Sequence, residues 1–103
     1  MATIEAMKKE KPEVAQAFLD MVKAIRANVC FDEKTGQLHV ISILTALHAY
    51  DGVAFHTRVA VKEGASRDEV TSSIICCLGT CGIGPTMKSM EAAVKVLDEL
   101  EVK

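Results

Sequence analysis

The chain has 103 residues, a length that fits one domain, and half of its residues are hydrophobic while only 4% are aromatic. Alanine, valine, leucine, isoleucine and methionine carry the apolar content, which suits packed helices better than a β-sandwich. Twelve basic and fourteen acidic side chains nearly balance, and no basic run or basic patch with aromatic residues occurs, so nucleic acid is excluded as an expected partner.

The N-terminal half predicts two long helices. The first begins at Pro12 and stops at Asn28, and its apolar residues recur at three- and four-residue spacing on one face: Val14, Phe18, Met21, Val22 and Ile25. The second begins after Asp32, whose side chain suits the N-cap position, and extends to Tyr50.

The C-terminal half predicts three more helices. Asp51 is expected to cap a helix that runs to about Glu63, and Gly64 suits the position that ends it. The segment "SRDE" from Ser66 to Glu69 is a capping box that opens a helix through about Thr80. Gly84-Pro85 is then expected to turn the chain into a last helix, which carries Met87, Met90, Val94 and Leu97 on one face.

These elements predict a single all-α domain over residues 1–103, with about five helices and short connections between antiparallel neighbours. The segments Leu38–Tyr50 and Val70–Thr80 lack Asp, Glu, Lys and Arg. A helix that is apolar around its whole circumference must be buried on all sides, so we expect a homo-oligomer that packs through these helices. The alternative is one chain wrapped tightly around its own core.

The compartment is expected to be the cytoplasm. The N-terminal "MATIEAMKKEKPE" is charged and lacks the apolar core of a signal peptide, so the four cysteines are expected to stay reduced. An intracellular disulfide, as found in thermophiles, is the alternative. Residues 70–87 are uncharged, but the Gly-Ile-Gly-Pro run would break a membrane-spanning helix, so no membrane association is expected.

Three segments, "FDEKTGQLHVISILTAL", "HTRVAVKEGASRDEV" and "TCGIGPTMKSMEAAVKVL", follow one another in this order. Together they resemble the carboxymuconolactone decarboxylase family, whose fold is shared with AhpD, the alkyl hydroperoxidase partner protein. The resemblance covers Phe31 to Leu100, and its most distinctive part is His-x-Arg followed by a glycine and an acidic helix start. It implies an AhpD-like fold and dimers of interlocked helices, often assembled as trimers of dimers, hence a hexamer.

The family resemblance implies two functional styles. AhpD-like members carry a Cys-x-x-Cys pair, a histidine four residues later and a glutamate upstream, and they use the thiols on peroxides or disulfides. Decarboxylase-like members lack the pair, keep the histidine and show Cys-Gly before the last helix. Here His56 matches the histidine, but the cysteine positions hold Ala49 and Gly52 and the glutamate position holds Gln37. Cys81-Gly82 matches the decarboxylase style, with one extra residue after it.

His56 is the expected catalytic residue, a general acid or base beside the small residues Gly52 and Ala60, which leave room for a ligand. A structural histidine that hydrogen-bonds a neighbouring subunit is the alternative. Arg58 is the expected substrate-binding residue because its guanidinium can hold a carboxylate, and an ion pair with an acidic side chain is its alternative.

The cysteines Cys76, Cys77 and Cys81 are expected to act as small buried hydrophobic residues. Cys77 and Cys81 share one helical face without being aimed for an easy disulfide, and a redox role for Cys81 is the alternative. The spacing of His39, His48 and His56 fits no zinc motif, so no metal and no cofactor are expected.

The favoured function is decarboxylase-like or isomerase-like (lyase-type) proton transfer on a small carboxylated molecule. Two alternatives stay open: a thiol-dependent peroxidase (peroxiredoxin) that uses a non-standard cysteine, and a non-enzymatic module that binds a small ligand or serves assembly.

Overall fold

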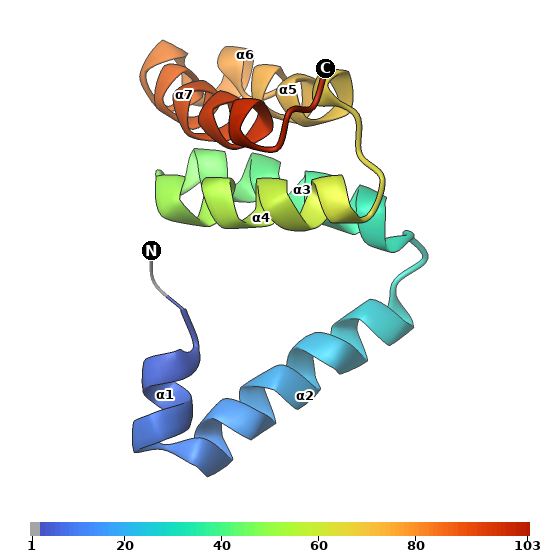
Figure 1. The fold of residues 1–103 in the computed structure, drawn as a ribbon, viewed down its shortest axis with the longest axis vertical. Helices are drawn as coiled ribbons and strands as arrows, with labels where there is room; N and C mark the ends of the chain where they lie inside the picture. Colours follow the sequence, from blue (N-terminus) through green and yellow to red (C-terminus); the bar gives the residue numbers. More distant parts are fainter. Residues whose placement is uncertain (1–2) are drawn as a thin grey trace. The chain divides into compact units, whose positions relative to one another are not determined.

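The structure is a computed structural model that describes residues 3–103, and its described residues form helices and no strands (Figure 1). The helices are α1 (Glu5–Glu10), α2 (Pro12–Asn28), α3 (Glu33–Ala46), α4 (Tyr50–Lys62), α5 (Arg67–Ile75), α6 (Leu78–Cys81) and α7 (Ile83–Glu99). The all-α prediction is confirmed. The expected set of about five helices lacked α1, and it merged α5 and α6 into one.

The described chain forms two compact units, residues 3–31 and residues 32–103. The first unit consists of α1 and α2, which pack against each other. Within its described residues only Ala15 is buried. The apolar stripe that the spacing predicted for α2 exists, but Val14, Phe18, Met21 and Ile25 are each about half exposed, at 58%, 46%, 51% and 52%. The expectation of a single domain over residues 1–103 stays a prediction.

The second unit holds the hydrophobic core. Helix α3 packs on α4 and α5, and α7 packs on α4 and α5, so α3 and α4 form one layer and α5 to α7 the other (Figure 1). The core side chains come from all four long helices of this unit: Ile41 from α3, Val53 and Ala60 from α4, Val70 and Ile74 from α5, and Ala93 and Leu97 from α7. This packing fixes α3 and α4 side by side, which positions the site described below.

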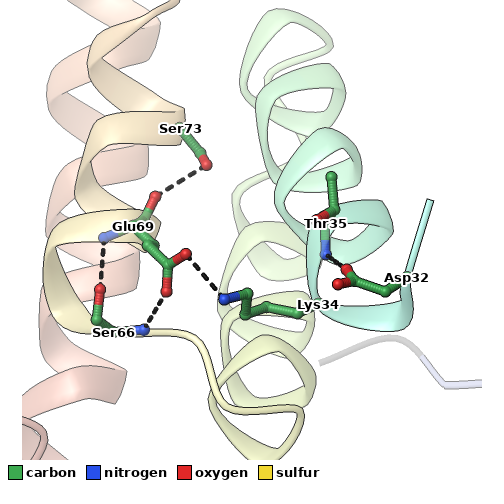
Figure 2. A network of polar contacts seen from close by, with 6 residues as sticks. All are labelled: Asp32, Lys34, Thr35, Ser66, Glu69 and Ser73. Carbon is green, nitrogen blue, oxygen red and sulfur yellow. Dashed lines mark hydrogen bonds and ion pairs between the residues drawn. The ribbon is translucent and has the colours of Figure 1, made fainter.

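Two of the predicted helix starts are built as expected (Figure 2). The Asp32 carboxylate accepts a hydrogen bond from the Thr35 backbone N–H at 2.7 Å, which caps α3. The Ser66 hydroxyl accepts from the Glu69 backbone N–H, and the Glu69 carboxylate accepts from the Ser66 backbone N–H, both at 3.0 Å. Glu69 also pairs with Lys34 at 3.0 Å, so one carboxylate joins the starts of α3 and α5.

The turn between α3 and α4 differs from the prediction. Helix α3 ends at Ala46 instead of reaching Tyr50, and α4 begins at Tyr50 with Ala49, not Asp51, at its N-cap position. His48 takes a left-handed conformation, with φ 58°. The His48 N–H donates to the Thr45 carbonyl and the Ala49 N–H to the Leu44 carbonyl, which together form a Schellman motif. A non-glycine residue in this role gives little sequence signal.

The turn before α7 also differs. The predicted helix through Thr80 stops at Ile75, and α6 follows as a single turn. The chain changes direction at Gly82, with φ 87°, instead of at Gly84-Pro85. Pro85 lies in the first turn of α7. Backbone N–H groups in the first turn of a helix have no carbonyl partner within the helix, so a proline there costs no hydrogen bond. None of the described helices is long and apolar enough to cross a membrane.

Candidate functional site

His56 lies in the second turn of α4 and is half-buried. Its ring meets the ring of Phe55 edge-on, with centroids 5.1 Å apart and an interplanar angle of 82°. The helix places Gly52 one turn before it and Ala60 one turn after it on the same face. Because α4 packs against α3, this face of α4 turns toward residues that are distant in sequence.

Gln37 of α3 makes a polar contact with His56. Its Oε1 lies 2.6 Å from Nδ1 of His56, across 19 residues of sequence. The Gln37 side chain is buried, with 3% of its surface exposed, so this hydrogen bond is shielded from water. The sequence had identified Gln37 only through the family resemblance, and the structure adds the contact.

This hydrogen bond selects the state of the imidazole. An amide oxygen only accepts hydrogen bonds, so Nδ1 of His56 is the donor and carries a hydrogen. In the neutral ring the lone pair then belongs to Nε2, which makes Nε2 the basic nitrogen. Gln37 has no titratable group near neutral pH, so it orients the ring and exchanges no proton with it.

Ala49 and Gly52 form the start of α4, where the AhpD-like style would have thiols. Ala49 is the N-cap residue and makes no side-chain cap. A Cβ atom on Gly52 would lie 3.0 Å from Cδ1 and 3.4 Å from Cδ2 of Leu44. The room expected beside the imidazole at Gly52 is therefore partly filled by Leu44, and Ala60 lies fully buried in the core.

The Arg58 side chain pairs with Glu99 and not with a residue of the contact between His56 and Gln37. It lies two residues further along α4, and its Nη2 lies 2.6 Å from Oε2 of Glu99 near the end of α7. Both side chains are nearly half exposed. The ion pair is thus the arrangement seen within one chain, and a role of Arg58 in substrate binding stays a prediction.

The cysteines lie apart from His56 in the described contacts. Cys77 is buried and directs its Sγ toward the carbonyl oxygens of Ser42, at 3.5 Å, and Ser73, at 3.7 Å. Burial raises the pKa of the Cys77 thiol, and the neighbouring Cys81 thiol raises it further. Cys81 is half-buried, while Cys30 and Cys76 are exposed. The environment of Cys77 therefore disfavours its thiolate form.

His56 stands at the position of the family histidine, and Gln37, Ala49 and Gly52 stand where the AhpD-like style has a glutamate and two cysteines. A family model described as the carboxymuconolactone decarboxylase family matches residues 12–95, most of the chain. The chain belongs to the carboxymuconolactone decarboxylase family. The match begins at Pro12, so it includes α2, which the resemblance from Phe31 to Leu100 had left out.

A solved structure of another carboxymuconolactone decarboxylase family protein, the apo form of a protein from Legionella pneumophila, has the same fold. Its TM-score is 0.80 and its sequence identity 24%, and the alignment covers 93% of this chain and 85% of that one. At this identity the likeness shows the fold alone. No curated protein matches the chain.

Two surface hollows of this carboxymuconolactone decarboxylase family chain lie away from the histidine. One, of about 540 Å³, is lined by Arg67, Asp98, Glu101, Val102 and Lys103. The other, of about 350 Å³, is lined by Met87, Met90, Glu91 and Val94. Both are open, and neither includes His56, so the chemistry of His56 and Gln37 identifies the site better than the hollows do. In the part of the chain that the structure describes, no three His, Cys, Asp or Glu side chains are grouped to hold a metal ion.

Proposed function

We propose that this carboxymuconolactone decarboxylase family protein catalyses proton transfer on a small carboxylated molecule, in a decarboxylation or an isomerisation, with His56 as acid and base. The observation that carries the proposal is the 2.6 Å hydrogen bond between Nδ1 of His56 and Oε1 of buried Gln37. It holds one tautomer and one ring orientation, which is what a general acid or base needs.

The proposed step uses Nε2. In a decarboxylation the bond between the carboxylate and its carbon breaks, carbon dioxide leaves, and the electron pair stays on the carbon or a conjugated oxygen. The imidazolium of His56 then gives its Nε2 proton to that atom and becomes neutral. Gln37 accepts the Nδ1 hydrogen bond before and after this transfer, so the ring keeps its orientation.

A thiol peroxidase is the weaker hypothesis. Positions 49 and 52 hold no sulfur, and the Cys77 thiol is buried with a raised pKa, whereas thiol attack requires the thiolate. Cys81 is half-buried and ends the single turn α6, and positions 49 and 52 hold no cysteine that could serve as its partner.

The proposal includes a homo-oligomer of interlocked dimers, up to a hexamer. It is supported by large apolar side chains that the single chain leaves exposed in both units, including Phe18 and Met21 in α2, Ile43 in α3 and Leu47 just after α3. A second subunit would cover these side chains. It would also offer a place for Arg58 to meet a substrate carboxylate, in competition with Glu99.

The test is a screen of carboxylated lactones and keto acids with wild type, His56→Ala and His39→Ala side by side. His39 is an exposed histidine of α3 and serves as the matched control. We expect His56→Ala to lose about 10²–10⁴-fold in kcat/KM and His39→Ala to keep the wild-type rate. Circular dichroism and gel filtration establish that both variants keep the fold and the assembly.

Three results would decide against the proposal. If a substrate is turned over and His56→Ala matches wild type, the histidine is structural. If a compound binds, is not turned over, and binds equally well to His56→Ala, the protein is a small-ligand module. Hydroperoxide turnover that disappears in Cys81→Ser would favour the peroxidase.

A further inference from the structure

Phe55 is a large apolar residue that lies outside the hydrophobic core. It stands in α4 directly before His56, and 43% of its surface is exposed. It belongs neither to the buried core cluster nor to the partly buried side chains that pack against that cluster. Core packing therefore does not account for an aromatic ring at this position.

The ring of Phe55 contacts the ring of His56. Their centroids lie 5.1 Å apart, and the two planes are nearly perpendicular, at 82°. Consecutive side chains of a helix do not face each other, so the helix backbone alone does not bring these rings together. The two side chains are turned toward one another, in the edge-to-face arrangement that aromatic pairs prefer at centroid separations of about 4.5–7 Å.

The imidazole of His56 needs more than one contact to hold a single orientation, because the torsion between Cβ and the ring has broad minima. The 2.6 Å hydrogen bond between Nδ1 and Oε1 of Gln37 fixes one corner of the ring. Small coupled changes of the side-chain torsions still tilt the plane without breaking that hydrogen bond. Such a tilt would lose the edge-to-face packing on Phe55, so Gln37 and Phe55 restrain different motions of the ring.

We propose that Phe55 is a positioning residue of the His56 site, whose ring holds the plane of the imidazole and thereby the direction in which Nε2 meets a substrate. Proton transfer requires Nε2 to come within about 2.6–3.2 Å of the receiving atom, so a tilted ring transfers its proton more slowly. The role of Nε2 rests on the proposed function, whereas the fixed plane rests on the ring contact alone.

The first arm of the experiment needs no substrate. Proton shifts and order parameters of the imidazoles are measured by NMR on the full chain with isotope-labelled histidine. Phe55→Leu keeps an apolar side chain and removes the ring. We expect the His56 resonances to lose their ring-current shift and the His56 order parameter to fall toward the range of flexible groups, below about 0.6. Phe55→Tyr keeps the ring and should keep both.

Tyr50→Leu is the matched control. Tyr50 lies in the same helix and stacks on His48, with ring centroids 6.2 Å apart and planes 13° apart. Its replacement should shift the resonances of His48 and leave those of His56 unchanged, and Phe55→Leu should do the reverse. Because Phe55 lies outside the core, Phe55→Leu is expected to keep the fold and the assembled mass, which circular dichroism and gel filtration check.

The second arm uses a substrate that the screen finds. Phe55→Leu is expected to lose about two- to tenfold in kcat, the rate equivalent of one aromatic pair, and to keep the wild-type KM because Phe55 acts through His56. Phe55→Tyr should restore kcat. If the screen finds no substrate, the proposed function fails, and the first arm still decides whether Phe55 holds the ring.

The proposal is overturned if the His56 resonances and order parameter are the same in wild type and Phe55→Leu. It is also overturned if Phe55→Leu raises KM and keeps kcat, which would make Phe55 a wall of the substrate site. A changed assembled mass in Phe55→Leu would overturn it as well, because Phe55 would then be an interface residue.

Discussion

Nδ1 of His56 and Oε1 of Gln37 lie 2.6 Å apart, so a glutamine occupies, in contact with the histidine, the place where the AhpD-like style has a glutamate. A carboxylate there would exchange protons and stabilise a positive ring. An amide oxygen accepts the Nδ1 hydrogen bond but exchanges no proton, so this contact fixes the tautomer without relaying a proton. The chain therefore differs from the thiol-dependent style in the side chain that contacts the histidine, which is a glutamine here and a glutamate there.

The tautomer gives the first prediction. In the neutral ring of His56 we expect the hydrogen on Nδ1, because Gln37 accepts it. Nitrogen chemical shifts of the imidazole distinguish the two tautomers directly. Gln37→Leu removes the acceptor and should lose the preference for Nδ1–H, while Gln37→Glu, which keeps an acceptor, should retain it. A wild-type ring that carries its hydrogen on Nε2 would contradict the hydrogen-bond assignment.

Gly52 and Leu44 give a prediction on stability. Gly52→Ala gains helix propensity, worth at most about 1 kcal/mol, but its Cβ meets Leu44 Cδ1 at 3.0 Å. Since Leu44 is partly buried against the core, we expect these effects to offset each other to within about 0.5 kcal/mol in wild type. In a Leu44→Ala background the same change should stabilise by about 0.5–1 kcal/mol, measured by urea unfolding. Equal effects in both backgrounds would show that the contact is unimportant.

The helix caps predict how stability depends on acid. The pKa of Glu69 is held below its ordinary value of 4.5 by the Ser66 backbone N–H and by Lys34, and the pKa of Asp32 below 3.8 by the Thr35 backbone N–H. The unfolded chain therefore binds protons at a higher pH than the native state does. The free energy of unfolding should fall as the pH drops through and below these values.

Glu69→Gln should make this acid dependence shallower, because the variant has no carboxylate to protonate at that position. Urea midpoints between neutral pH and about pH 3 measure the effect. Glu91→Gln, a change at an exposed glutamate of α7, is the control. If both variants lose the same part of the acid dependence, the cap does not cause it.

The exposed stripe of α2 predicts assembly. Light scattering coupled to gel filtration should give a mass well above the 11.1 kDa of one chain. Phe18→Glu places a charge in the stripe and should shift the protein toward smaller species. Gln16→Glu adds the same charge on the opposite face of α2 and should leave the mass unchanged. A stable, folded wild-type monomer at micromolar concentration would contradict the burial argument.

Local chemistry made much of the fold predictable from the sequence. Asp32 caps α3, and Ser66 and Glu69 form the box that starts α5, because each cap joins residues only three positions apart. Apolar spacing predicted α2 from Pro12 to Asn28, because the three- and four-residue spacing of apolar side chains is likewise a relation between nearby residues. The family resemblance identified His56 as the catalytic residue and Gln37 as the residue at the family's glutamate position, although it said nothing of their contact.

Only the tertiary structure decided the rest. His48 closes α3 in a left-handed conformation, Leu44 fills the space beside Gly52, and Arg58 pairs with Glu99 across 41 residues. The 2.6 Å contact of Gln37 with His56 likewise depends on the packing of α3 against α4. Periodicity in a sequence tells which face of a helix is apolar, because that depends on neighbours within a turn or two. Which distant helix meets that face, and with which side chain, is set by how the whole core fills its volume.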